Sequence, residues 1–469
     1  MNPSVSGSLR RSLARYPWGP AAAPILERAL AAVDPRRRLK RSLERDGDRL
    51  ILPDGTRRDL GSFRDIILIA VGKAALPLGE GALDLLGDRI SRGICIGKYP
   101  ADSGGALEQA GIPYLTAGHP LPNQDSLRAG ERVLSLAETA GEGDLVLVLL
   151  SGGGSALLEA PAPGLDLEDL LATQRSLLRS GAEIEQINTV RKQLSRLKGG
   201  RLAARVHPAQ LITLALSDVL DDRPDVIASG PTAPDHTSPE QARDVIRNHH
   251  LETTLPPAVW DHLKTKGTGE GRRSLNDNQE ANPDLFGNYY IIGNNRTAAR
   301  EAVHAGRKEG FHSLLLTTRL EGEAQEIGRA CGAVLTGMAR DGDPVPRPGL
   351  LVAGGETTVS ISPDTVSGQG GRNLELALAA VENLRDIPGC ALITLATDGD
   401  DGSTNAAGAV VTGKTADEAD QQGMEPAQFL AEHDSQAFFQ RLNGLIHTGP
   451  THTNVNDLVL LFTFPEDSV

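Results

Sequence analysis

The stretch Leu145–Leu150 (LVLVLL), followed directly by Ser151–Ser155 (SGGGS), decides the fold class of this chain. Its six apolar residues do not alternate with polar ones, so they predict a strand buried on both faces, as in a parallel sheet covered by helices. The glycines that follow predict a tight turn in which the backbone can approach a ligand closely. A strand, a turn and a helix in this order are typical of an α/β protein.

Further apolar runs repeat this pattern along the chain. Each run ends at glycine or at a small or charged polar residue, and a helix-like segment follows it. These runs are Ile66–Val71, Leu211–Leu216, Tyr289–Ile292, Leu314–Leu316, Leu350–Ala353 and Ala391–Ala396. We therefore expect a mostly parallel sheet with helices on both faces, and a ligand site outside the carboxyl ends of the strands, where the polar residues gather.

The composition excludes several classes of protein. The 469 residues suffice for about two or three domains, and a formal net charge of −14 disfavours nucleic acid and anionic membranes as partners. Cys95, Cys331 and Cys390 are too few for a disulfide framework or a Cys-based zinc site. No apolar stretch approaches the ~18 residues of a membrane span, and the N-terminus lacks the apolar core of a signal peptide, so we expect a cytoplasmic protein.

Two nucleotide-binding signatures are rejected. Gly408–Thr415 (GAVVTGKT) matches the P-loop pattern formally, but its central residues are typical of a strand, with Gly413 and Lys414 as the turn after it. We interpret it as a chance match. No G-x-G-x-x-G motif follows a predicted strand, so the standard dinucleotide fingerprint is also missing.

Two post-strand turns are candidates for binding an anion. In the turn Ser151, Gly152, Gly153, Gly154 and Ser155, free backbone N–H groups at a helix start would attract a phosphate or carboxylate. Lys73 follows another buried strand and a glycine, where it could offer a point charge to a phosphoryl group. The alternative for the lysine is an ordinary solvated side chain.

An amphipathic segment, Glu183–Lys198, carries two cations and an amide on one helical face. Asn188, Arg191 and Lys192 follow the i, i+3, i+4 spacing, so together they could clamp a carboxylate. A solvated helix face is the alternative that the spacing alone leaves open.

Further polar residues stand near the other predicted strands. Arg372 follows a glycine-rich stretch and begins a helical pattern, where it could offset the charge of a transferred phosphoryl group. Asp218 and Asp398 each follow a buried strand, and Mg²⁺ needs only one or two carboxylates beside substrate phosphates, although helix capping could also explain either aspartate. The polar run from His447 to Asp457 fits either ligand binding or a well-bonded turn.

The motifs taken together resemble the class II glycerate kinases, also called glycerate 2-kinases, with their MOFRL-type C-terminal domain. The similar segments follow the family's order through most of the chain. They are VGKAA (71–75), AGHPLP (117–122), SGGGSALL (151–158), INTVRKQLSRLKGGRLA (187–203), SDV (217–219), IASGPTAPD (227–235), GGETTV (354–359), GGRNLELAL (371–378), TDGDDG (397–402) and TGPTHTNVNDL (448–458).

The resemblance implies both a fold and a reaction. It implies two Rossmann-like α/β/α domains, which we place at residues 1–285 and 286–469 because a hydrophilic stretch (264–288) separates them, with the active site in the cleft between them. It implies transfer of the ATP γ-phosphoryl group to the 2-hydroxyl of D-glycerate, with Mg²⁺ as cofactor. Rival activities are an NAD(P)H-dependent hydroxypyruvate reductase, phosphorylation at the 3-hydroxyl, and a non-catalytic binding protein.

The resemblance also assigns residues. Lys73 and Arg372 match the family's two catalytic cations. The turn at 151–155, with Asn188, Arg191 and Lys192, is expected to bind substrate or nucleotide, as are three residues in other shared motifs, Gly355, Glu356 and Asn373. Asp218 or Asp398 is expected to hold Mg²⁺ or accept the hydroxyl proton, and the residues do not decide between them. ATP and D-glycerate are the expected partners, and a homodimer stays open.

The chain departs from the family's pattern at a few positions. Asp221 and His452 stand where glycine is usual, and Asp400 and Ser403 alter the usual D-G-x-D-G-P motif. These departures concern the nucleotide loops and the substrate preference.

Overall fold

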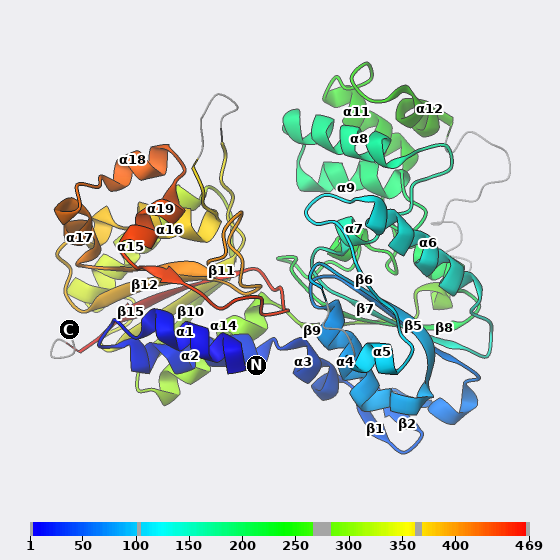
Figure 1. Cartoon of the computed structure of the whole chain (residues 1–469), viewed down its shortest axis with the longest axis horizontal. Coiled ribbons are helices and arrows are strands. Elements are labelled where there is room, and N and C mark those ends of the chain that lie inside the picture. The colour runs from blue at the N-terminus through cyan, green and yellow to red at the C-terminus, as the bar shows by residue number, and fades with distance from the viewer. Residues whose placement is uncertain (1–2, 101–104, 266–282, 362–367, 466–469) are drawn as a thin grey trace. The chain divides into compact units, whose positions relative to one another are not determined.

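The computed structural model describes residues 3–100, 105–265, 283–361 and 368–465, and the chain forms two compact units (Figure 1). One unit is Pro35–Ile292, and the other combines Met1–Asp34 with Gly293–Val469. This division differs from the expected one at 285/286, because the first 34 residues pack with the C-terminal part of the chain. The hydrophilic stretch at 264–288 ends shortly before the change of unit at Ile292/Gly293, and its residues 266–282 lie outside the described residues.

The unit Pro35–Ile292 is built on a six-stranded sheet with the order β6-β5-β4-β7-β8-β9. The strands are β4 (Ile66–Val71), β5 (Ile90–Gly97), β6 (Tyr114–Thr116), β7 (Leu145–Leu150), β8 (Gln210–Leu216) and β9 (Asn288–Gly293). The ladders β5–β6, β4–β5, β4–β7 and β7–β8 are parallel, and every residue of β4 and β7 is buried, as the apolar runs predict. The parallel α/β class is thus confirmed for this unit.

Helices cover both faces of this sheet. Alternate residues of β4, such as Ile67 and Ile69, share a core with α6 and α10, whereas α4 and α3 pack from the other side. The helices α8, α9, α11 and α12 form a separate small core with Leu177 and Ile187 among its members. The helices are α3 (Pro35–Ser42), α4 (Ala75–Leu86), α5 (Ala106–Gln109), α6 (Gln124–Glu138), α7 (Gly154–Leu157), α8 (Leu167–Arg179), α9 (Ile184–Gln193), α10 (Arg201–Val206), α11 (Pro239–Asn248) and α12 (Pro257–Thr265).

A small antiparallel sheet precedes the first buried strand. It consists of β1 (Glu44–Asp46), β2 (Arg49–Ile51) and β3 (Arg57–Asp59), in that order.

The second unit has a mixed sheet, which corrects the expectation of a mostly parallel one. Its order is β10-β11-β15-β12-β13-β14, and among the ladders that the described residues form in this sheet, β10–β11 alone is parallel. The causes are β15, which lies antiparallel between β11 and β12, and β13, which runs antiparallel to β12. The strands are β10 (His312–Leu320), β11 (Gly349–Gly355), β12 (Cys390–Ala396), β13 (Gly408–Thr412), β14 (Leu445–Ile446) and β15 (Asp457–Thr463).

Strand β10 also differs from its expected character. It is an edge strand, and Leu314 and Leu316 are exposed, so this run is not a strand buried on both faces. A three-residue apolar run carries too little pattern to separate the two cases.

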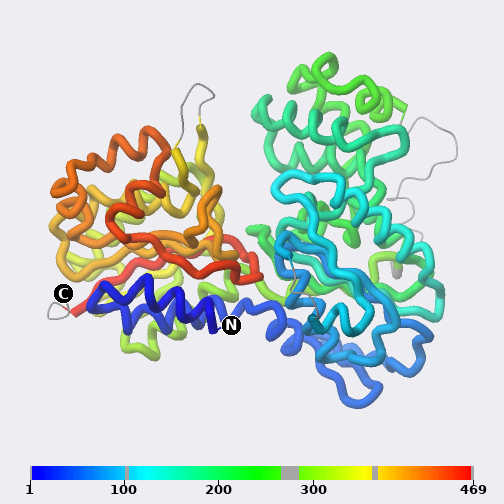
Figure 2. Tube along the Cα trace, viewed as in Figure 1, coloured from blue at the N-terminus to red at the C-terminus, as the bar shows by residue number. Residues whose placement is uncertain are grey.

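The N-terminal helices belong to the second unit. Helices α1 (Pro3–Leu13) and α2 (Gly19–Ala32) pack against each other, and α2 packs along α14 (Asn295–Lys308), so the blue and the red ends of the chain lie in one unit (Figure 2). The other helices of this unit are α15 (Ala324–Arg340), α16 (Arg372–Ala379), α17 (Thr415–Gln421), α18 (Pro426–Ala431) and α19 (Ser435–Arg441). No helix in the described part of the chain has the length and apolarity that a bilayer crossing requires.

Candidate functional site

The turns after β4 and β7 are joined at the carboxyl ends of these adjacent strands. Val71 lies opposite Leu150 in the ladder, so Gly72 and Ser151 meet directly beyond it. The Ser151 hydroxyl accepts a hydrogen bond from the Ala74 N–H at 3.0 Å, and the Lys73 N–H donates to the Gly152 carbonyl at 2.9 Å. A Cβ atom on Gly72 would lie 2.1 Å from Ser151 Oγ, so only glycine fits there. Ser151 and Gly152 therefore hold the Lys73 turn in place.

Gly153 separates Lys73 from a histidine. Its φ of 83° is left-handed, and an added Cβ atom would lie 2.9 Å from the His119 ring and 3.3 Å from Lys73 Cγ. The structure thus brings the Lys73 stem and the His119 imidazole together around the Cα of one glycine, on the side where a side chain would stand. His119 belongs to the AGHPLP motif, but the residue pattern alone did not single it out.

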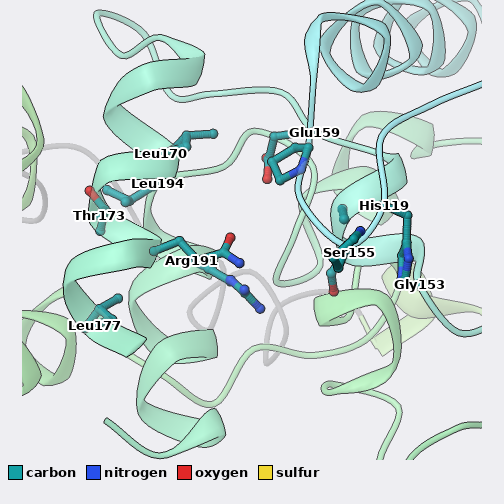
Figure 3. A pocket seen from close by; sticks show the side chains of 13 residues that line it. His119, Gly153, Ser155, Glu159, Leu170, Thr173, Leu177, Arg191 and Leu194 are labelled. Atoms are coloured by element: carbon teal, nitrogen blue, oxygen red, sulfur yellow. The ribbon is translucent and has the colours of Figure 1, made fainter. Parts of the chain in front are cut away.

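Gly153 and Ser155 line a pocket of about 130 Å³ within this unit (Figure 3). Its polar lining includes His119, Glu159 and Arg191, and the Arg191 side chain extends toward Ser155 in the figure. Apolar side chains close the other side, and they come from α8 and from the residue after α9; they are Leu170, Leu177 and Leu194. Of the predicted anion-binding turn, Gly153 and Ser155 are thus the members that reach this pocket.

A chain of hydrogen bonds connects Ser155 to Arg191. Ser155 Oγ lies 2.7 Å from Ser229 Oγ, Ser229 donates to Asn188 Oδ1 at 3.4 Å, and Arg191 donates to the same oxygen at 3.4 Å. Burial lowers the pKa of the Arg191 guanidinium, and the Glu159 carboxylate opposes this shift. The predicted residues Ser155, Asn188 and Arg191 are therefore brought together, through a serine that the sequence analysis missed.

Ser229 has an unusual backbone. It is fully buried, its φ is 59°, and Ala228 before it has a φ of 51°, so two non-glycine residues in sequence are left-handed. Such conformations cost about 1–3 kcal/mol each and persist only where the surroundings enforce them. The motif IASGP contains Ser229, but nothing in the residue pattern indicates a left-handed serine.

Lys192 does not face the pocket with its neighbour Arg191. Its side chain is 2% exposed, and its ammonium group lies 3.2 Å from Asp225 and 3.5 Å from Asp235. It therefore joins α9 to the segment that carries Ser229, which is a structural role and differs from the carboxylate clamp that we expected.

A second buried ion pair borders the pocket. Glu159 forms an ion pair with Lys198, and the Ser195 hydroxyl donates to the same carboxylate at 3.1 Å. Burial lowers the pKa of the Lys198 ammonium although Glu159 opposes the shift. The sequence analysis did not identify this pair.

In the second unit, Arg372 begins α16 between two carboxylates. Its guanidinium donates to Asp457 and to Glu356, each at 2.5 Å. The antiparallel entry of β15 explains this grouping, because Asp457 at its start lies opposite Gly355 and Ala396 at the ends of β11 and β12. Burial lowers the pKa of Arg372, but Asp457 and Glu356 outweigh it and hold the pKa above its ordinary value. Glu356 is thus a partner of Arg372.

Asn373 and Gly355 have structural contacts. Asn373 is buried, and Asp401 accepts hydrogen bonds from its N–H at 3.0 Å, from its amide at 3.2 Å and from the Leu374 N–H at 2.8 Å. Burial raises the pKa of Asp401 to about 7 against these hydrogen bonds. Gly355 has a φ of 152°, and an added Cβ atom would lie 2.3 Å from the Leu320 carbonyl oxygen. Asn373 therefore fixes the start of α16 next to Arg372, and Gly355 fixes the backbone next to Glu356, the partner of Arg372.

Asp218 and Asp398 stand where the sequence analysis expects them, each two residues after a strand, β8 and β12. Asp398 is buried and accepts a hydrogen bond from the Asp400 N–H at 3.2 Å. Within the described ranges, no group of three or more His, Cys, Asp or Glu side chains is arranged to hold a metal ion. Since Mg²⁺ binds through one or two carboxylates plus substrate phosphates, either aspartate alone has the chemistry of a donor to that ion.

The segment that matches the P-loop pattern is part of a sheet. Gly408–Thr412 is strand β13, and Lys414 is exposed, which confirms that this match is no phosphate loop.

His452, which stands where the family resemblance leads us to expect glycine, has a left-handed φ of 57°. The backbone there keeps the conformation that favours glycine in spite of the substitution.

The fold and the site define a protein of two α/β units with a candidate anion pocket in the first. A model described as "Domain of unknown function (DUF4147)" matches residues 21–264, and the MOFRL family model matches residues 349–457. The first match covers more than half of the chain.

Relatives extend the match to most of the chain. A D-glycerate 2-kinase of Thermotoga maritima is 41% identical and covers 84% of this chain and 90% of its own length. A crystal structure of a glycerate kinase of the same organism has a TM-score of 0.77 and 37% identity, over 94% of this chain and 97% of the other. An Agrobacterium vitis protein named as a candidate hydroxypyruvate reductase is 36% identical over 84% of this chain and 97% of its own. The chain belongs to the glycerate kinase family with a MOFRL domain.

Proposed function

We propose that this protein transfers the γ-phosphoryl group of ATP to the 2-hydroxyl of D-glycerate, giving 2-phosphoglycerate and ADP. The observation that carries the proposal is the pocket in which Arg191 and Ser155 face each other beside the Lys73 turn. The relative from Thermotoga maritima is named for this activity at 41% identity. A pocket with one cation and nearby hydroxyl groups suits a small hydroxy acid.

Arg191 binds the carboxylate of glycerate in this proposal. A guanidinium presents paired donors that match a carboxylate, and Arg191 is held by Asn188 in the pocket wall. Leu170, Leu177 and Leu194 also line the pocket, and apolar surroundings strengthen an ion pair. Lys192 acts indirectly, because its buried pairs with Asp225 and Asp235 fix the end of α9.

Lys73 and Arg372 stabilise charge on the transferred phosphoryl group. Phosphoryl transfer demands positioning and charge stabilisation rather than covalent chemistry by the protein. The Lys73 backbone is fixed by Gly152 and Ser151, so its side chain starts from a rigid turn. Arg372 is charged at every physiological pH, as a guanidinium ordinarily is, and its two carboxylate partners raise its pKa further.

A bound Mg²⁺ would neutralise charge on the ATP phosphates. Asp218 and Asp398, which follow buried strands, are the residues that we propose to hold it. Either aspartate could instead accept the hydroxyl proton of the substrate.

A coupled assay of ADP release tests this function. The purified protein with ATP, Mg²⁺ and D-glycerate is expected to release ADP, and omission of D-glycerate is expected to stop the release. The name of the Agrobacterium vitis relative makes hydroxypyruvate reduction the second candidate. NAD(P)H oxidation with hydroxypyruvate, in a preparation that releases no ADP with D-glycerate, would replace the kinase assignment by the reductase.

A further inference from the structure

We infer that Ser155 recognises a hydroxyl group of the acceptor substrate by accepting its hydrogen bond, and that Ser229 and Asn188 fix Ser155 in this role. The inference rests on the proposed function, since it concerns the substrate pocket of the kinase. It deepens that function, because it assigns to one side chain the discrimination between a hydroxy acid and its deoxy analogue.

The direction of each hydrogen bond in the chain follows from Arg191. A guanidinium has donors and no acceptor, so the Asn188 atom that lies 3.4 Å from Arg191 must be the amide oxygen. The donor-only guanidinium therefore fixes the orientation of the Asn188 amide, whose oxygen and nitrogen are otherwise easily interchanged.

Ser229 donates to that same oxygen at 3.4 Å. The amide oxygen of Asn188 can only accept, and a serine hydroxyl has a single proton. If Ser229 used its proton toward Ser155 instead, two acceptor oxygens would face each other across this distance with no proton between them.

With the Ser229 proton directed to Asn188, Ser155 is the donor to Ser229, whose oxygen lies at 2.7 Å. This bond uses the only proton of the Ser155 hydroxyl, so the lone pairs that remain are what Ser155 presents to the pocket that it lines. A carboxylate or phosphate oxygen placed there would meet lone pairs, whereas a hydroxyl group could donate to them. Arg191 therefore binds the anionic group of the substrate, and Ser155 binds its hydroxyl group.

The surroundings keep Ser229 in this orientation. The residue is fully buried, and the left-handed backbone at Ala228 and Ser229 sets the direction of its side chain. The same segment is held at Asp225, which pairs with the buried Lys192 and lies 2.8 Å from the position of a Cβ atom on Gly230. Ser229 is therefore a positioning residue that acts through Ser155.

The test compares three acids in the full-length wild type and in Ser229→Ala. Equilibrium binding is measured by isothermal titration for D-glycerate, for D-lactate, which lacks the 3-hydroxyl, and for 3-hydroxypropanoate, which lacks the 2-hydroxyl. We expect the variant to bind D-glycerate about threefold to tenfold more weakly, as for the loss of one net hydrogen bond. The analogue that lacks the recognised hydroxyl is expected to bind both proteins within about twofold, and the other analogue to weaken like glycerate.

An equal loss for all three acids, or no loss for any of them, would overturn the inference. An equal loss would mean that Ser229 only shapes the Arg191 site. Because binding is read without turnover, a wild type that binds glycerate but releases no ADP refutes the kinase and leaves this test intact.

Two further variants separate the hydroxyl from the strained backbone. Ser229→Gly adopts a φ of 59° without strain and also lacks the hydroxyl, so it should reproduce the pattern of Ser229→Ala. Ala228→Gly relieves the neighbouring strain but keeps the Ser229 hydroxyl, so its binding of all three acids should match the wild type. A Ser229→Gly variant that binds like the wild type would contradict the inference even if Ser229→Ala folded poorly.

Discussion

At the scale of single residues, close approach between backbone and side chains fixes the site. Gly72 and Gly153 stand where a Cβ atom would strike Ser151 and His119 respectively. The glycines of the turn after β7 were predicted to let the backbone approach another group closely. The identity of that group was not predicted, because His119 is distant in sequence and reaches Gly153 only through the fold.

Gly153→Ala is expected to lower kcat/KM for D-glycerate by about tenfold or more. The new methyl group would lie 2.9 Å from the His119 ring and displace it or the Lys73 stem. The left-handed backbone adds a cost of about 1–2 kcal/mol in stability. Gly164→Ala is the matched control, since its φ of 86° is similar and no atom lies within 4 Å of its Cβ position. Steady-state kinetics and thermal unfolding of both variants check this; equal kinetics in the two would contradict it.

Lys73→Ala and Arg372→Ala should each lower kcat by ~10²-fold or more, as for lost electrostatic stabilisers of a transition state. Lys414→Ala serves as the control, because Lys414 belongs to the rejected P-loop match and is exposed on the surface. Its kcat should stay within about twofold of the wild type. Coupled ADP-release kinetics measure all three, and near-normal turnover in the first two variants would refute their catalytic roles.

At the scale of elements, buried strands were the most predictable part and their partners the least. The runs at 66–71 and 145–150 coincide with β4 and β7, because continuous apolar residues identify doubly buried strands directly. Strand β15 was missed as a sheet member, and its antiparallel place between β11 and β12 depends on pairing with distant residues. Because this strand was not predicted, the contact between Asp457 at its start and Arg372 was not predicted either.

The contacts of helix α9 were also only partly predictable from the sequence. Spacing placed Asn188, Arg191 and Lys192 on one face, and the first two do interact. Lys192 is instead covered by the segment with Asp225 and Asp235, and a helical period cannot show where a loop from another part of the chain will lie.

Lys192→Met is expected to lower the free energy of unfolding by about 3–5 kcal/mol, because the buried Asp235 loses its ion pair, whereas Asp225 keeps its pair with Arg223. Lys264→Met is the control, since Lys264 is 49% exposed and pairs with an exposed Asp261 at 2.7 Å. An exposed pair contributes about 0–1 kcal/mol. Denaturant titrations measure both; a similar small loss in each would show that the Lys192 pairs do not stabilise the fold.

Asp401, whose buried carboxyl group accepts hydrogen bonds from the first turn of α16, makes the free energy of unfolding depend on pH. The pKa of Asp401 is raised from 3.8 to about 7, so the folded state binds this proton more tightly than the unfolded state does. The stabilisation from this group is complete below about pH 4 and is lost as the pH rises through about 7. At about 1.4 kcal/mol per pKa unit, the loss is on the order of 4 kcal/mol.

Asp401→Asn keeps the group neutral and should flatten this part of the pH dependence. The free energy of unfolding is measured by denaturant titration at several pH values between 4 and 8. An unchanged slope in the variant would assign the pH dependence to other groups, such as Asp457, whose pKa is also raised by burial.

At the scale of the whole molecule, the chain divides into units that do not follow its linear order. Met1–Asp34 joins the C-terminal unit, and this was not predicted, because the pattern of these residues does not indicate which distant part of the chain they pack against. Lys73 belongs to one unit and Arg372 to the other.

Phosphorus NMR of the reaction mixture tests the central claim most directly. With ATP, Mg²⁺ and D-glycerate, the account predicts the resonances of ADP and of a phosphate ester on carbon 2 of glycerate, in equal amounts. An ester on carbon 3 would contradict the assigned acceptor hydroxyl, and the absence of any glycerate ester would contradict the kinase itself.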